Sequence, residues 1–79
     1  MKILKFTASW CGPCKVLTEN MKGIEAEAID IDTSPELCAK YNVRSVPTLI
    51  MTDDDGNELK RRTGSGSTTQ IQEWINASN

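Results

Sequence analysis

The sequence predicts an α/β fold in which a mixed four-stranded sheet carries helices on both faces. Apolar, β-rich runs alternate with segments of helical spacing along the chain. A helix-length segment separates the first two runs, so we expect parallel strands joined by a right-handed crossover. The last two runs are joined by a short turn, as in an antiparallel hairpin. The predicted order is therefore β-α-β-α-β-β-α.

Length, composition and charge are typical of one globular domain. The chain has 79 residues, 38% hydrophobic and 25% charged, so residues 1–79 are predicted to form a single domain. The net charge of −2 favours neither nucleic acid nor an anionic membrane as a partner. The N-terminal apolar stretch is too short for a signal peptide, and no segment has membrane-spanning length. We therefore expect a cytoplasmic protein, and a monomer.

The first strand and helix are read from residues 3–23. Residues 3–7 are apolar-rich and predict a strand, which runs into a turn. Pro13 suits the first turn of a helix, where its missing N–H has no partner to lose. Lys22 and Gly23 supply a cation in the last turn and a stop signal. Three apolar side chains at helical spacing should form the buried face of this helix: Cys14, Leu17 and Met21.

A second strand and helix follow. Residues 24–31 predict a strand. Thr33 or Ser34 should cap the next helix, and Glu36 stands three residues after Thr33, as in a capping box. This helix is expected to end near Asn42 and to contain Cys38 as a spare buried thiol, because a free cysteine packs like a small hydrophobe.

The last three elements are a hairpin and a helix. Residues 46–52 and 58–63 predict its two strands, joined by an Asp- and Gly-rich turn. The cationic run 60–62 suits an exposed edge that must not pair with another chain. Ser67 and Gln70 have capping-box spacing and should open the last helix, with Trp74 on its apolar face.

Cys11 and Cys14 form the motif that carries chemistry. Cys11 comes just before the predicted helix, so unpaired N–H groups and the positive end of the helix dipole should favour its thiolate, which is the nucleophile. Cys14 lies one turn into the helix and should be the buried partner of an exposed Cys11. This spacing predicts a redox pair: Cys11 attacks a disulfide, and Cys14 resolves the mixed disulfide.

The helix dipole alone is barely sufficient to ionise the Cys11 thiol at pH 7. A free thiol with a pKa near 8.5 is about 3% thiolate at pH 7, and making it half thiolate requires roughly 2 kcal/mol. A helix terminus gives about 0.3–1 kcal/mol when exposed and up to ~2 kcal/mol when partly buried. Hydrogen-bond donors to the Cys11 sulfur should supply the remainder.

The pair has two other possible interpretations. A zinc site usually needs four ligands, but the chain has three cysteines and no histidine, so a carboxylate or another chain would have to complete the set. A purely structural bond between Cys11 and Cys14 closes too small a loop for much entropic benefit. We therefore predict no metal.

Residues 10–15, Trp-Cys-Gly-Pro-Cys-Lys, resemble the active-site motif of the thioredoxin family. Residues 40–49 resemble that family's stretch ending in a cis-proline, and Gly56 and Gly64 stand where it has hairpin and loop glycines. The resemblance covers nearly the whole chain. The chain resembles a shortened member of the family, about the size of a glutaredoxin. It implies a thioredoxin-like fold for the single domain and a protein-disulfide reductase with a redox-active centre.

The resemblance also implies partners and a substrate site. A cis peptide bond before Pro47 should bring it against the cysteines, and the Val46 backbone should pair with an extended substrate. Electrons would come from thioredoxin reductase or from glutathione, and no cofactor beyond the dithiol would be needed. The implied cellular roles are electron transport and cell redox homeostasis. The implied substrate-contact residues are Trp10, Gly12, Pro13, Val46, Pro47 and Gly64.

The chain departs from this family at Lys5. The family has a buried aspartate six residues before the first cysteine, and its lysine partner corresponds to Ala28. A charged Lys5 near Cys14 would favour the thiolate rather than accept its proton. Alternatively, the long stem of Lys5 carries the ammonium to the surface.

Two alternative functions stay open. One is a glutaredoxin-like protein reduced by glutathione: the small size and an anion site at residues 64–67 would favour it, whereas Gly12 and Pro13 argue against it. The other is a non-catalytic binding subunit that uses the fold as a docking surface, in which replacing both Cys11 and Cys14 would leave function intact.

Overall fold

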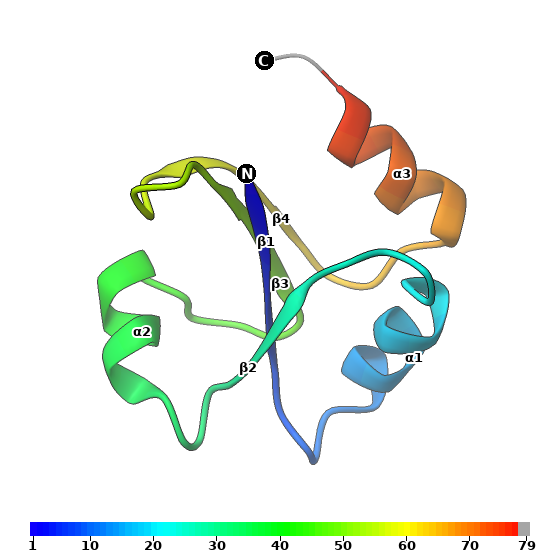
Figure 1. Ribbon diagram of the computed structural model, residues 1–79. Helices are drawn as coiled ribbons and strands as arrows, with labels where there is room; N and C mark the ends of the chain where they lie inside the picture. Colours follow the sequence, from blue (N-terminus) through cyan, green and yellow to red (C-terminus); the bar gives the residue numbers. More distant parts are fainter. Residues whose placement is uncertain (78–79) are drawn as a thin grey trace.

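The computed structural model describes residues 1–77 and has the predicted order of elements (Figure 1). Four strands form one sheet: β1 Lys2–Thr7, β2 Glu27–Asp30, β3 Thr48–Thr52 and β4 Glu58–Thr63. Three helices connect and cover it: α1 Gly12–Asn20, α2 Pro35–Tyr41 and α3 Thr68–Asn76. Helix α2 covers one face of the sheet, and α1 and α3 cover the other (Figure 1).

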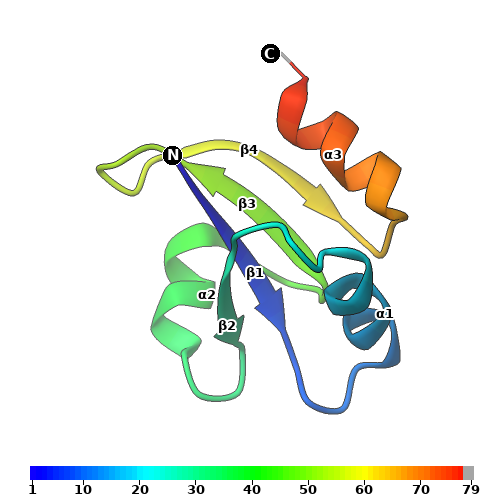
Figure 2. The ribbon, with the colours of Figure 1, turned by 45° about the vertical axis from the view of Figure 1, so that its right-hand side comes forward.

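The sheet is mixed, in the order β2-β1-β3-β4. Strands β1 and β2 are parallel, whereas β3 runs antiparallel to both of its neighbours, β1 and β4. Figure 2 shows β1 and β3 at the centre, with the chain leaving the carboxyl end of β1 directly toward α1. The predicted α/β fold, with its parallel crossover and terminal hairpin, is confirmed.

The alternation of side chains along β1 divides the core into two halves. Leu4 and Phe6 point toward α2, where they pack with Tyr41. Ile3 points to the opposite face and packs against the cluster formed by α1 and α3. Strand β3 is buried along its whole length because it lies between two strands and under helices on both faces. Cys14, Leu17 and Met21 are all buried, as predicted.

Two strands are shorter than predicted. Strand β2 begins at Glu27 rather than at residue 24, because the ladder with β1 covers only Glu27–Asp30. Ile24 still packs against the core cluster of α1 and α3, so its apolar character reflects burial rather than strand pairing. Strand β3 begins at Thr48, directly after Pro47, which lacks the N–H that a ladder needs.

The predicted helix ends are partly correct. Pro13 lies in the first turn of α1, but the helix ends at Asn20, so Lys22 falls outside its last turn. Gly23 follows with φ +86°, a left-handed conformation that glycine adopts at little steric cost.

The N-terminus of α2 differs from the prediction. Ser34 caps this helix without a side-chain hydrogen bond, and the predicted capping box with Thr33 and Glu36 is wrong. The Thr33 hydroxyl donates instead to the Asp30 carbonyl, at 3.4 Å. The capping box of α3 is confirmed: the Gln70 N–H donates to Ser67 Oγ at 3.1 Å, and Gln70 Oε1 accepts from the Ser67 N–H at 2.9 Å.

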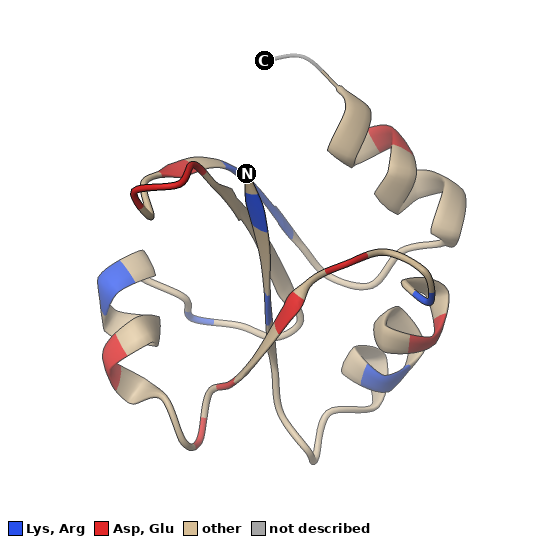
Figure 3. Cartoon of the chain, in the orientation of Figure 1, with Lys and Arg blue, Asp and Glu red and all other residues tan. Residues whose placement is uncertain are grey.

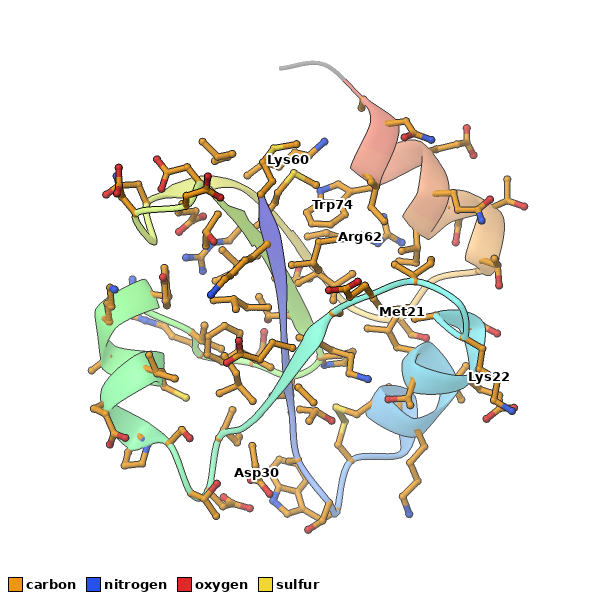
Figure 4. The ribbon with its side chains drawn as sticks, in the orientation of Figure 1. Met21, Lys22, Asp30, Lys60, Arg62 and Trp74 are labelled. Atoms are coloured by element: carbon orange, nitrogen blue, oxygen red, sulfur yellow. A yellow bond between two sulfur atoms is a disulfide. The ribbon has the colours of Figure 1, made fainter. Side chains whose placement is uncertain are left out.

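The cations of β4 are not merely a solvated edge. Lys60 Nζ donates to the Trp74 carbonyl and, at 2.8 Å, to the Ala77 carbonyl, at the C-terminal end of α3. It also lies 5.2 Å from the centre of the Trp74 ring, and Figure 4 shows the two side chains together between β4 and α3. Arg61 points to the other face and donates to the Tyr41 carbonyl of α2. Both cations thus satisfy carbonyls at helix C-termini, where positive charge is favourable.

Charges of both signs are spread over the elements, and acidic residues gather at the β3–β4 turn (Figure 3). Within residues 1–77, no helix has the length and apolar character needed to cross a membrane.

Candidate active site

The site is built where the loop after β1 becomes α1. A backbone hydrogen bond from the Cys11 N–H to the Ala8 carbonyl, at 3.2 Å, closes the turn. Cys11 then adopts an extended conformation (φ −93°, ψ 112°) as the N-cap of α1. Its sulfur takes the place of a capping oxygen and accepts the Cys14 N–H at 3.2 Å. The predicted donation to the Cys11 sulfur is therefore present, from the unpaired donors at the helix start.

Cys11 and Cys14 are joined by a disulfide, with their Cα atoms 5.3 Å apart. Cys11 is 5% exposed and Cys14 is 2% exposed. The expectation of a well-exposed Cys11 is therefore wrong. Both cysteines pack with Ala8 in a small cluster, and Ile31 and Val46 close over it.

A cis peptide bond joins Val46 to Pro47, as the resemblance predicted. The Val46 carbonyl oxygen lies 4.0 Å from Cys11 Sγ, and Pro47 is buried. The Pro47 carbonyl accepts the N–H of Gly64 at 2.9 Å, and Gly64 has φ +86°, in the left-handed region. Segments that are far apart in the sequence therefore meet around the Cys11 sulfur.

Trp10 forms the exposed flank of the site. Its side chain is 67% exposed, yet Nε1 donates to Asp32 Oδ2 at 3.1 Å. Gly12 and Pro13 are also exposed, in the first turn of α1. Asp32 was missed from the sequence. The signal that could have found it is the parallel pairing of β1 and β2, which brings the loops after both strands to one edge of the sheet.

A hollow of about 220 Å³ lies beside the disulfide, on the α2 side. Ile31 and Val46, which pack against the cysteines, form one wall, and Cys38 contributes to another. Cys38 is half-buried and outside any disulfide, so the expected buried thiol is partly accessible. Arg44 supplies a cation at the rim of the hollow.

Lys5 points from β1 toward α1, the helix that carries the cysteines. Its Nζ donates to Thr18 Oγ1 at 2.9 Å, and the residue is half-buried. Burial lowers the pKa of the Lys5 ammonium. Ala28 is its neighbour across the β1–β2 ladder, so no acidic partner stands there.

No three His, Cys, Asp or Glu side chains are grouped so as to hold a metal ion in the part of the chain from residue 1 to residue 77.

Two sulfurs lie at a helix N-terminus, where one accepts a helix N–H and both pack against the loop with the cis-proline. This arrangement defines a thiol–disulfide oxidoreductase. The family model for thioredoxin matches residues 1–77. The chain belongs to the thioredoxin family, whose members need no bound cofactor, and its homologues support protein-disulfide reductase activity.

Relatives in bacteria agree with this assignment. Thioredoxin of Chlamydia trachomatis is 42% identical over 69 residues, covering 78% of this chain and 67% of the relative. Thioredoxin of Rickettsia bellii is 34% identical over 82 residues, covering 94% and 77%.

Among solved structures, thioredoxin 1 of Thermosipho africanus has a TM-score of 0.78 and 30% identity, covering 95% of this chain and 90% of that one. A mutant thioredoxin of Halobacterium salinarum has a TM-score of 0.83 and 29% identity, covering 92% and 69%.

Proposed function

We propose that the chain reduces protein disulfides through its Cys-Gly-Pro-Cys dithiol, with Cys11 as nucleophile and Cys14 as resolving residue. The observation that carries this proposal is the hydrogen bond from the Cys14 N–H to Cys11 Sγ, at 3.2 Å, at the N-terminus of α1. A donor at this distance stabilises negative charge on sulfur, and so does the helix dipole. The nucleophile of thiol–disulfide exchange is the thiolate.

The exchange proceeds in two steps. The Cys11 thiolate attacks one sulfur of the substrate disulfide, forms a mixed disulfide and releases the other substrate sulfur as a thiolate. Cys14 then loses its proton to solvent and attacks Cys11 Sγ, which forms the Cys11–Cys14 disulfide and releases the second substrate thiolate. The substrate gains two electrons and the protein loses two. In the disulfide form the Cα atoms of Cys11 and Cys14 are 5.3 Å apart, within the usual range for disulfides.

We assign substrate contact to the residues around Cys11. The Val46 carbonyl, 4.0 Å from Cys11 Sγ, supports backbone pairing of an extended substrate beside the disulfide. The exposed Trp10, Gly12, Pro13 and Gly64 and the buried Pro47 complete the rim.

Electrons for the next turnover come from a thioredoxin reductase in this proposal. Glutathione is the alternative donor, and one observation disfavours it. The start of α3, where an anion such as a glutathione carboxylate could bind, already uses two of its donors, the N–H groups of Ser67 and Gln70, in the capping box. We further propose a cytoplasmic role in electron transport and redox homeostasis, with no nucleic acid or membrane partner and the chain acting as a monomer.

The proposal is tested by reduction of insulin disulfides in the presence of dithiothreitol. Wild type should reduce insulin, whereas Cys11→Ser should be inactive. Cys14→Ser should accumulate a mixed disulfide with the substrate, visible as an adduct by mass spectrometry without reductant. Cys38→Ser is the matched control, because it removes a thiol that belongs to no disulfide, and it should keep wild-type activity.

Four outcomes would redirect the proposal. An inactive wild type, or activity retained in Cys11→Ser, would favour the non-catalytic binding subunit. An adduct on Cys11→Ser instead of Cys14→Ser would exchange the two roles. Turnover with glutathione and its reductase, but not with NADPH and thioredoxin reductase, would identify a glutaredoxin-like protein.

A further inference from the structure

Lys5 is a cation held beside the helix that carries Cys14. It lies on the face of β1 that α1 covers, and its ammonium is fixed 2.9 Å from Thr18 Oγ1. Thr18 follows Cys14 by four residues, so the two side chains are neighbours on one face of α1. Both line a hollow of about 420 Å³ that opens to solvent along this side of the helix. The side chain of Lys5 therefore ends at the surface of α1, bound to a residue one helical turn from Cys14.

The acidic groups around this hollow are engaged elsewhere. Glu19 of α1 pairs with Lys22, at 2.7 Å. Asp30, at the end of β2 (Figure 4), accepts the Asp32 N–H at 2.8 Å. The remaining charged group at the rim is Lys15, a second cation. Strand β3 contributes the apolar Leu49 opposite Lys5.

Lys5 therefore has no ion pair within residues 1–77. Partial burial also withholds some of the water that would screen its charge, and it lowers the pKa of Lys5 itself. An incompletely hydrated cation without a counter-ion gains stabilisation from any negative charge that develops nearby. The one group beside it that becomes negative during turnover is the thiol of Cys14.

We propose that Lys5 is a positioning residue for the resolving step, whose ammonium favours the thiolate form of Cys14. This inference rests on the proposed function, because it assumes that Cys14 is the resolving residue. After Cys11 has formed the mixed disulfide, the Cys14 proton leaves to solvent through the hollow. The Cys14 thiolate then attacks Cys11 Sγ, and the substrate sulfur leaves as a thiolate. Lys5 keeps its own protons throughout and acts through its charge.

The first test is a titration of the whole chain in its reduced form by NMR, with ¹³Cβ-labelled cysteine. Lys5→Met removes the cation and keeps an unbranched side chain, and the pKa of Cys14 should rise by about one unit. Lys5→Arg keeps the charge and should stay close to wild type. Lys2→Met is the matched control, because it removes the same charge from the exposed far end of the same strand. An unchanged Cys14 pKa in Lys5→Met would overturn the proposal.

The second test separates the two chemical steps. A limiting amount of the aromatic disulfide DTNB should release one coloured thiolate when Cys11 attacks and a second when Cys14 resolves the adduct. In Lys5→Met the second release at pH 7 should be about three- to tenfold slower, and the first release should be unchanged. Equal slowing of both releases would overturn a specific role at Cys14.

The two tests also distinguish failure of the proposed function from failure of this inference. A wild type that attacks DTNB without a second release would overturn the proposed function, whereas the Cys14 titration would still decide whether Lys5 acts on that thiol.

Discussion

Cys11 and Cys14 are three residues apart but have different surroundings. Cys11 is the N-cap of α1, so its sulfur accepts a backbone N–H and lies against the Val46 carbonyl. Cys14 lies in the first turn of α1, one turn before Thr18, which accepts a hydrogen bond from Lys5. In the mechanism that we propose, the helix N-terminus supports charge on the first sulfur and the Lys5 ammonium supports it on the second. Each thiol has its own source of stabilisation, which suits two attacks that occur in sequence.

Asp32 sets the position of Trp10, so we predict that Asp32→Ala weakens the reduction of protein substrates. The exposed indole loses the acceptor 3.1 Å from its Nε1 and samples other rotamers. Loss of a hydrogen bond to a charged group at this exposed position should lower kcat/KM for insulin by about three- to tenfold. Kinetics with insulin and with a small disulfide would check this, because a small substrate needs little contact with Trp10. Asp54→Ala, on the distant hairpin turn, is the control. Equal losses for both substrates would contradict a positioning role.

Sequence alone predicts the local part of the site. The motif fixes the cysteine pair and the N-terminal proline of α1, and the resemblance of residues 40–49 to the thioredoxin family implied the cis bond before Pro47. Asp32 and Thr18 could not be assigned, because their contacts with Trp10 and Lys5 depend on how β1 packs against β2 and α1. The burial of Cys11 was missed for the same reason. It depends on Ile31 and Val46, which come from two other loops.

Strand β4 donates hydrogen bonds to helices on both faces of the sheet. Successive side chains of a strand point to opposite faces, so Lys60 reaches the end of α3 while Arg61 reaches the end of α2. The sequence could indicate only that an edge strand carries charge. Which carbonyls those charges meet depends on how β4 packs against α2 and α3, because the bonded residues are 14 and 20 positions apart in the sequence.

The ion pair between Glu58 and Arg61, the residue that joins β4 to α2, predicts that stability depends on pH. Arg61 donates to both carboxylate oxygens of Glu58, at 2.6 Å each, and this holds the pKa of Glu58 below its usual value of 4.5. A carboxyl group whose pKa is lower in the folded state stabilises the fold above its unfolded pKa. The contribution is lost as the pH falls through the lowered folded value. Because the pair is about one third exposed, the contribution should be below about 1 kcal/mol.

We therefore expect Glu58→Gln to lower the free energy of unfolding at pH 7 by up to about 1 kcal/mol and to have little effect near pH 2.5. Urea unfolding of both proteins at the two pH values measures this difference. Glu25→Gln, at an exposed loop position, is the control for removing one acidic charge. A difference that persisted unchanged at pH 2.5 would mean that the ion pair is not its source.

At the scale of the whole molecule, stability depends on two small clusters on opposite faces of one sheet. Phe6 and Tyr41 pack edge to face on the α2 side, with ring centres 6.1 Å apart. Leu17 and Ile71 join α1 and α3 to the sheet on the other side, and both are fully buried. A chain of 79 residues should have a free energy of unfolding of only about 4–12 kcal/mol. The fold therefore needs both clusters to stay stable, and the cluster under α1 also supports the active site.

Leu17→Ala should accordingly destabilise the protein by about 2–5 kcal/mol, because it leaves a cavity where α1 meets the sheet and α3. Val16 is the matched control: it is the preceding residue of the same helix but is 53% exposed, so Val16→Ala should change stability by less than about 0.5 kcal/mol. Urea unfolding of the oxidised proteins would give both values. Comparable losses for the two variants would mean that the buried contacts of Leu17 are not the source of the destabilisation. If packing dominates, folded Leu17→Ala protein should also attack DTNB more slowly, because the Cys14 N–H would be held less firmly against Cys11 Sγ.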